Sequence, residues 1–258
     1  MRLMKRILSA AAVLALSASL LVGCSSGTAS SVPVSASSAA ESTVSSVEET
    51  ASSAVDENEA AAAQLLNDLT GSYQELWPVI LADEYKQTWL DDCTALVGED
   101  NAEAAFEKLS SMVTGDVYGE DAVEAYANGG GAYFCGFTNS LAILTFDGET
   151  STISGTDKDG NVLFSHAYHY IGMEPVRGLY EFESDDADSG EFTYFFLAPD
   201  TSAETYHIEF RYGSDAEALS QYDAGEYAYW LASGISTDCD QTMIDNCIEL
   251  FCTENLAG

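Results

Sequence analysis

Between residues 140 and 212 the chain alternates short apolar segments with turn sequences, and this pattern constrains the fold most strongly. Strands are expected at residues 140–146, 151–154, 161–172, 179–183, 192–197 and 205–212. Turn sequences such as Asp147-Gly148 and Asp157-Lys-Asp-Gly160 separate them. Short connections favour an antiparallel meander, and a meander closes most economically as a small barrel because closure removes its exposed edges.

Helical patterns flank these strands. An apolar stripe at three- and four-residue spacing predicts one leading helix, through Leu65, Leu66, Leu69, Tyr73, Leu76 and Trp77. Further helices are expected at Ala102–Val113 and Ala122–Ala127, and Gly129-Gly-Gly131 ends helical character. The chain closes with a helix capped by Thr237 or Asp238, whose apolar stripe comprises Met243, Ile244, Cys247, Ile248 and Phe251. The predicted domain is therefore mainly β, with helices covering one end of the barrel.

The N-terminus has the pattern of a secretory signal. A basic start, Met1–Arg6, precedes an apolar run from Ile7 to Val22, which is shorter than the ~20 residues of a membrane span. The run ends in Leu21-Val22-Gly23-Cys24, which resembles the lipobox of bacterial lipoproteins. That resemblance implies cleavage after residue 23, a palmitate-bearing lipid on Cys24, and a location on the extracytoplasmic face of the cell membrane. An ordinary signal with a chance cysteine is the alternative.

The composition changes after Cys24. Residues 24–61 are rich in Ser, Ala and Glu and carry almost no large apolar side chains, so we expect a disordered tether. Residues 62–258 have the composition of one globular domain.

The chain is strongly acidic. Its formal charge is −35, and five basic residues remain once the signal is removed: Lys86, Lys108, Lys158, Arg177 and Arg211. Such a surface repels nucleic acid and anionic lipid head groups, so neither is expected as a partner. It attracts cations only diffusely, and solubility is its simplest role.

Five cysteines follow Cys24, namely Cys93, Cys135, Cys239, Cys247 and Cys252. Outside the cytoplasm cysteines tend to pair, and an odd number leaves at least one thiol. The last three lack the close spacing of structural zinc sites. The pairing stays open.

One strand carries the clearest candidate for a metal site. In Ala203-Glu-Thr-Tyr-His-Ile-Glu-Phe-Arg-Tyr-Gly213, alternate residues Thr205, His207 and Glu209 share a face. A histidine and a carboxylate on one face can line a metal pocket.

Several segments together resemble the ZinT (YodA) family in their order. They are Leu69–Leu81, His169-Tyr-Ile-Gly172, Leu179–Glu183, Ala203–Gly213, Glu217–Leu219 and the aromatic cluster of Tyr227, Tyr229 and Trp230. The resemblance implies a lipocalin-like (calycin) antiparallel β-barrel with added helices. It also implies the binding of zinc or another divalent metal and its transfer to a metal transporter.

The family's zinc ligands are only partly present. The resemblance places one of three ligand histidines at His207 and another at Thr205, which is a poor ligand. The loop that would hold the third, Ala198–Ser202, has no histidine. His207 with Glu209 would suit ions harder than zinc. The alternative is a hydrogen-bonded structural histidine.

Other candidate sites are weaker. His166 and His169 have opposite parity on their strand, so they face opposite sides. Asp185, Asp186 and Asp188 lie in a polar hairpin that is expected to be a solvated loop. No residue set assigns an acid, a base or a nucleophile, so we do not expect an enzyme. The sequence leaves two hypotheses: a metal-binding lipoprotein, or a calycin domain that has lost zinc and binds a small ligand or a protein partner.

Overall fold

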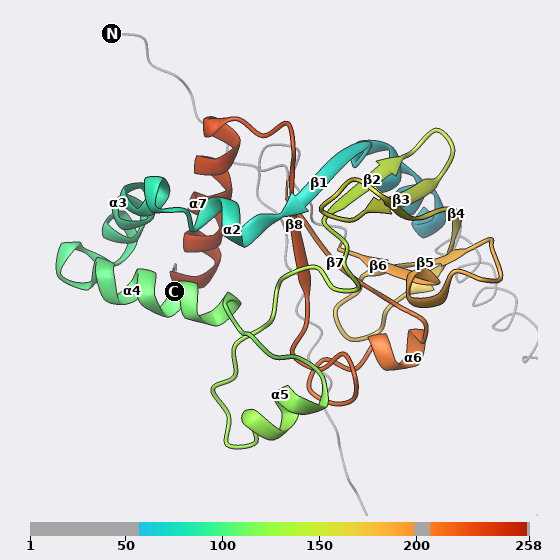
Figure 1. Cartoon of the computed structure of the whole chain (residues 1–258). Coiled ribbons are helices and arrows are strands. Elements are labelled where there is room, and N and C mark those ends of the chain that lie inside the picture. Colours follow the sequence, from blue (N-terminus) through green and yellow to red (C-terminus); the bar gives the residue numbers. More distant parts are fainter. Residues whose placement is uncertain (1–56, 199–206, 257–258) are drawn as a thin grey trace, which may run out of the picture. The chain divides into compact units, whose positions relative to one another are not determined.

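The computed structural model describes residues 57–198 and 207–256. Its strands form a closed barrel in which each strand pairs antiparallel with its neighbours in sequence and β8 returns to β1 (Figure 1). This confirms the predicted antiparallel barrel. The strands are β1 (Gly71–Glu75), β2 (Ile143–Asp147), β3 (Thr152–Thr156), β4 (Val162–Met173), β5 (Tyr180–Ser184), β6 (Tyr194–Leu197), β7 (His207–Gly213) and β8 (Ala232–Ser236).

Aromatic side chains fill the barrel interior. Phe164 and Phe195 lie on strands that are not neighbours, β4 and β6, yet their ring centroids are 5.8 Å apart. The ring of Tyr212 on β7 lies 5.3 Å from that of Phe195, and both side chains are fully buried. A small ligand inside the barrel would have to displace such rings. The barrel interior therefore does not support the hypothesis that the protein binds a small ligand there.

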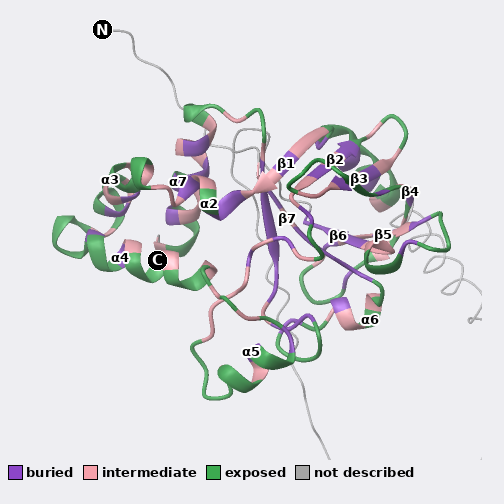
Figure 2. Ribbon diagram, viewed as in Figure 1, coloured by how far each residue is buried: buried purple, intermediate pink, exposed green. Residues whose placement is uncertain are grey.

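A second core lies outside the barrel, between β8 and a layer of helices. This layer comprises α2 (Leu76–Ile80), α3 (Lys86–Val97), α4 (Glu99–Val113) and α7 (Gln241–Leu256). Ile235 of β8 belongs to this core together with Trp89 and Ile248. In Figure 2, buried stretches of β8 and α7 mark the two sides of this core. These helices therefore cover a side of the barrel. The prediction that helices cover one end of the barrel is wrong for this layer.

The prediction of a single leading helix is wrong. Residues 57–68 are helical, β1 follows, and α2 begins at Leu76. The helix cannot continue because Gly71 has φ +148°, outside the helical region. Tyr73 fitted the apolar stripe of the predicted helix because it is buried, but it is buried in the barrel core as part of β1. The first described residues, 57–61, are already helical, although they belong to the segment predicted to be a disordered tether.

The C-terminal region differs from the prediction in two ways. β8 was not predicted, because its sequence Ala-Ser-Gly-Ile-Ser has few β-branched or aromatic residues. α7 matches the predicted closing helix, but its cap is Asp240, whose Oδ1 accepts a hydrogen bond from the backbone N–H of Met243 at 3.0 Å. The predicted helices at 102–113 and 122–127 correspond to α4 and α5 (Glu120–Ala125).

A buried arginine ties a long loop to the barrel. Arg211 of β7 is fully buried and donates hydrogen bonds to the backbone carbonyls of Leu219, Gln221 and Tyr227. Its guanidinium carbon lies 4.4 Å from the ring centroid of Tyr222. The loop between β7 and β8, which contains the short helix α6 (Ala216–Leu219), is therefore tied to β7 by the donors of this buried side chain. Burial lowers the pKa of Arg211, although an arginine still keeps its charge.

Several predictions lie outside the described residues: the signal, Cys24, most of the tether and Thr205. None of the helices within residues 57–198 and 207–256 combines the length and the apolarity that crossing a membrane requires.

Candidate functional site

His207 and Glu209 lie on the outer face of β7, beside the helical layer. Within the pairing with β8, His207 stands opposite Ile235, and Glu209 stands opposite Ser233. Ile235 belongs to the second core, so this face points away from the barrel interior. The prediction that His207 and Glu209 share a face is confirmed, and that face turns towards α2 and α7.

A small cavity lies where β7 meets α2 and α7, and we call it the β7–α7 pocket. Its volume is about 30 Å³, which is enough for one water molecule or one ion. His207 and Glu209 enter from the strand, and Cys247 and Glu254 enter from α7. Apolar residues complete its wall: Leu76, Trp77, Ile80, Leu250 and Phe251.

The donor types in this pocket fit a divalent metal, but they are not arranged as a finished site. An imidazole, two carboxylates and a thiol are all zinc ligands. No group of three or more His, Cys, Asp or Glu residues in the described part of the chain has the arrangement of a metal site. A metal could therefore be held only after side chains of the pocket had moved.

The thiol is the least available of these donors. Burial, together with the nearby negative charge of Glu209, raises the pKa of Cys247 to about 12. Since only the thiolate binds metal, Cys247 would have to lose its proton as the ion enters.

The other two histidines lie elsewhere and apart from each other. His166 pairs with Ile153 on the inner face of β4, and its Nδ1 lies 2.7 Å from Oδ2 of Asp186. His169 pairs with Glu183 on the outer face, and its Nδ1 lies 2.7 Å from Oδ1 of Asp185. The predicted opposite orientation is confirmed. Asp185 and Asp186 of the hairpin are therefore the partners of these two histidines.

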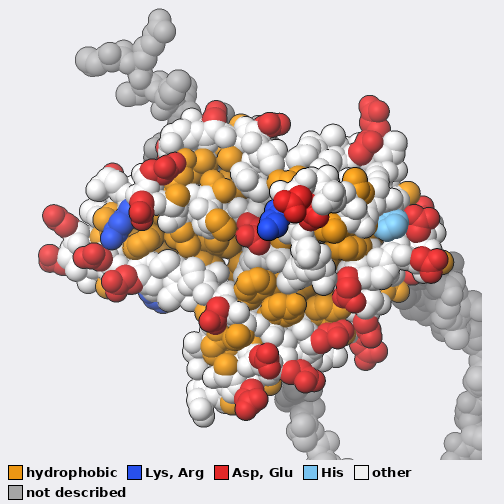
Figure 3. Space-filling model, viewed as in Figure 1, with side chains coloured by type: hydrophobic (Ala, Val, Ile, Leu, Met, Phe, Trp, Pro, Cys, Tyr) orange, Lys and Arg blue, Asp and Glu red, His pale blue; other side chains and the backbone are white. Residues whose placement is uncertain are grey.

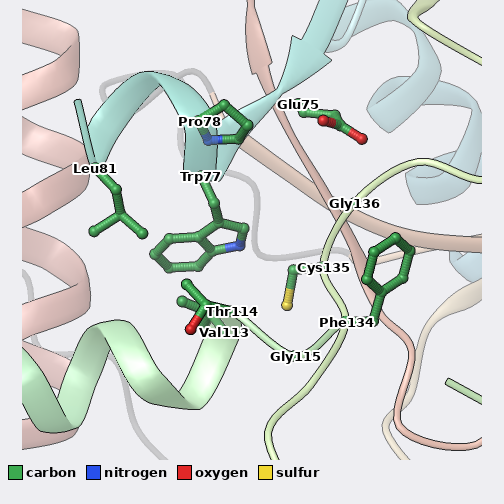
Figure 4. A pocket seen from close by; sticks show the side chains of 10 residues that line it. All are labelled: Glu75, Trp77, Pro78, Leu81, Val113, Thr114, Gly115, Phe134, Cys135 and Gly136. Atoms are coloured by element: carbon green, nitrogen blue, oxygen red, sulfur yellow. The ribbon is translucent and has the colours of Figure 1, made fainter. Parts of the chain in front are cut away.

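A larger pocket lies on another side of α2 (Figure 4). Its volume is about 350 Å³, within the range of small-molecule sites. The lining is mostly apolar, from Trp77, Pro78, Leu81, Val113 and Phe134, with Glu75, Thr114, Gly115, Cys135 and Gly136 completing it. Nε1 of Trp77 is buried and has no hydrogen-bond partner of good geometry among the described residues, although it lies close enough to the Cys135 thiol to offset part of the rise that burial causes in the pKa of that group.

Comparison with solved structures finds similar domains in Streptococcus pneumoniae. The Zn(II)-bound ZinT-like domain of AdcA has 15% identity and a TM-score of 0.45, and the match covers 71% of this chain and 89% of that domain. Zn(II)-bound AdcA has 14% identity and a TM-score of 0.42, and the match covers 72% of this chain and 35% of AdcA. This chain thus spans about a third of AdcA. No protein family and no curated protein matches the sequence.

The alternation of residues in β7 predicted the strand side of the β7–α7 pocket, whereas no pattern predicted its helix side. Cys247 and Glu254 are seven residues apart, which places them on one face of α7. The helical periodicity could therefore have predicted that Cys247 and Glu254 share one face of α7. Nothing in the sequence indicated that this face packs against His207.

Proposed function

We propose that this protein is an extracytoplasmic, lipid-anchored binding protein that takes up a divalent cation at the β7–α7 pocket. The observation that supports the proposal is the meeting of His207, Glu209, Cys247 and Glu254 around one ion-sized cavity. The anchor rests on the signal and on Cys24, and incorporation of labelled palmitate that is lost in Cys24→Ser would test it.

The charge of the protein favours a cation at this place. The whole chain carries a formal charge of −35, and Asp and Glu are spread over the face of the molecule that Figure 3 shows. Such a field raises the local concentration of cations without selecting among them. Selection would come from the pocket, where an imidazole with carboxylates suits zinc and also harder ions such as manganese. A role in passing metal to a transporter belongs to the same proposal.

Calorimetry can test the cation site directly. We expect the purified domain, residues 45–258, to bind one Zn²⁺ with a dissociation constant below about 10 μM, and His207→Ala to weaken binding at least about tenfold, because the only imidazole of the pocket is lost. His169→Ala is the matched control, since it removes a histidine outside the pocket. Affinity that is unchanged in His207→Ala, or lost equally in His169→Ala, would contradict the proposed site. Mn²⁺ in parallel would decide between softer and harder ions.

The pocket of about 350 Å³ supports a second candidate, the binding of a small apolar molecule that carries a hydrogen-bond acceptor. The buried N–H of Trp77 has no partner of good geometry among the described residues and only the Cys135 thiol beside it, so it is the group that such an acceptor would satisfy. We expect the uncharged fluorescent probe N-phenyl-1-naphthylamine to bind, and Val113→Phe to weaken binding at least about fivefold by filling the pocket. Val176→Phe, at an exposed position, is the control. Equal binding by all three proteins would exclude this pocket.

A further inference from the structure

The cysteines of the described residues gather in one part of the molecule. Four of them belong to the core between β8 and the helices, and the fifth, Cys239, packs against it. None lies in the aromatic core of the barrel. Any disulfide among them would therefore strengthen the helical layer.

Within this group, Cys93 and Cys252 form a close pair. The Sγ atom of Cys93 on α3 lies 3.9 Å from the Sγ atom of Cys252 on α7, and both residues are fully buried. They come from helices that pack against each other, and Phe251 beside Cys252 also contacts Trp89 of α3, with ring centroids 6.0 Å apart. The polar contacts of Cys135, by contrast, are with groups other than thiols, among them the backbone oxygen of Tyr133 at 3.8 Å.

We propose that Cys93 and Cys252 form a disulfide bond when the protein folds in an oxidising compartment. A disulfide has an S–S length of about 2.05 Å, so the two sulfur atoms must approach by roughly 1.9 Å. Rotation about the Cα–Cβ bonds, with a slight shift of either helix, supplies such a movement. The secretory signal predicted at residues 1–23 leads to a compartment of this kind.

The oxidation balances with a small-molecule disulfide as oxidant. One cysteine thiolate attacks the oxidant and forms a mixed disulfide, and the other cysteine then displaces the remaining thiolate. The two protein thiols lose two protons and two electrons, and the oxidant is reduced to two thiols. Burial raises the pKa of both Cys93 and Cys252, so the exchange belongs to a stage of folding before α3 and α7 enclose them.

The bond would join segments that are distant in sequence. It closes a loop from residue 93 to residue 252, which contains most of the barrel. A loop of this length strongly restricts the unfolded chain, so the bond should raise the melting temperature by about 5–15 °C. It leaves Cys135, Cys239 and Cys247 as thiols, and Cys247 remains a candidate ligand in the β7–α7 pocket.

Refolding followed by peptide mapping tests the bond. Residues 45–258, which form one compact unit, are reduced, unfolded and refolded with oxidised and reduced glutathione. We expect a product lighter by two hydrogen atoms, with three alkylatable thiols and one linked peptide pair that contains Cys93 and Cys252. Adding a reductant should lower its melting temperature.

Variants give the matched controls. Cys93→Ser and Cys252→Ser should each lose the linked peptides and the response to reductant, whereas Cys135→Ala should keep both. Five alkylatable thiols after oxidation of the unaltered domain, or a link between other cysteines, would overturn the proposal, and this readout needs no variant to fold. Zinc titration of the unaltered domain is a separate measurement, so failure of the metal site would not be mistaken for failure of the disulfide.

Discussion

Arg211→Leu is expected to destabilise the domain by about 3–5 kcal/mol, because it removes the buried cation whose hydrogen bonds hold the β7–β8 loop. The carbonyl oxygens of Leu219, Gln221 and Tyr227 would each lose a buried donor. A buried polar group without its partner costs about 1–3 kcal/mol, and leucine offers no donor in return. Urea unfolding, followed by circular dichroism, measures the loss.

Two comparisons separate the hydrogen bonds of Arg211 from its charge and its stacking. Arg211→Lys keeps a charge but cannot match the fork of donors, so we expect it to recover only part of the stability. Arg177 is the comparison for stacking alone, because its guanidinium carbon also lies 4.4 Å from the ring centroid of Tyr222 but its side chain is exposed. Arg177→Ala should therefore cost less than about 1 kcal/mol. Equal losses in Arg211→Leu and Arg177→Ala would contradict this explanation.

Trp89→Ala is expected to cost about 3–5 kcal/mol, since it opens a large cavity in the core between β8 and the helices. Trp89 is fully buried on α3 and packs near Phe106 and Phe251, with ring centroids 5.7 and 6.0 Å away. Its Nε1 also donates a hydrogen bond of 2.7 Å to the backbone oxygen of Ile80 at the end of α2. Because α2 lines both candidate pockets, the loss should weaken binding at each of them as well.

Trp89→Phe distinguishes the ring from its hydrogen bond. It keeps an aromatic ring in the core, so we expect a smaller loss than in Trp89→Ala, made up of the missing hydrogen bond and the smaller ring. Thermal and urea unfolding of the two variants give the comparison. A Trp89→Ala variant as stable as Trp89→Phe would show that the packing of the ring contributes little.

The strands from β2 to β7 could be predicted because each shows its own local pattern. In β4 and at the start of β7, buried aromatic or aliphatic residues alternate with more exposed ones. Turn residues such as Asp157 and Gly160 separate β3 from β4. Burial of Phe195 and Tyr212 inside a barrel follows from that alternation once the sheet closes. β1 and β8 could not be predicted in the same way. β1 is short and lies within an apparent helical stripe, and β8 consists mostly of small residues that the neighbouring strands and α2 bury.

One part of the candidate metal site could be predicted from local sequence patterns, and the other part depends on tertiary contacts. The alternation of β7 alone placed His207 and Glu209 on one face, since successive side chains of a strand point to opposite sides. The choice of side needed the barrel register, in which His207 stands opposite Ile235 and so points to the helical layer. Cys247 and Glu254 join the pocket because α7 packs there, a contact that no local pattern specifies.

The sequence by itself thus determined the antiparallel barrel, the acidic surface and the shared face of His207 and Glu209, because these depend on residue type and on short-range periodicity. Only the tertiary structure decided which helix faces that strand, that Cys93 meets Cys252, and that Arg211 holds the β7–β8 loop. Each of these joins residues from separate elements, and their meeting depends on how those elements pack rather than on the preference of either one.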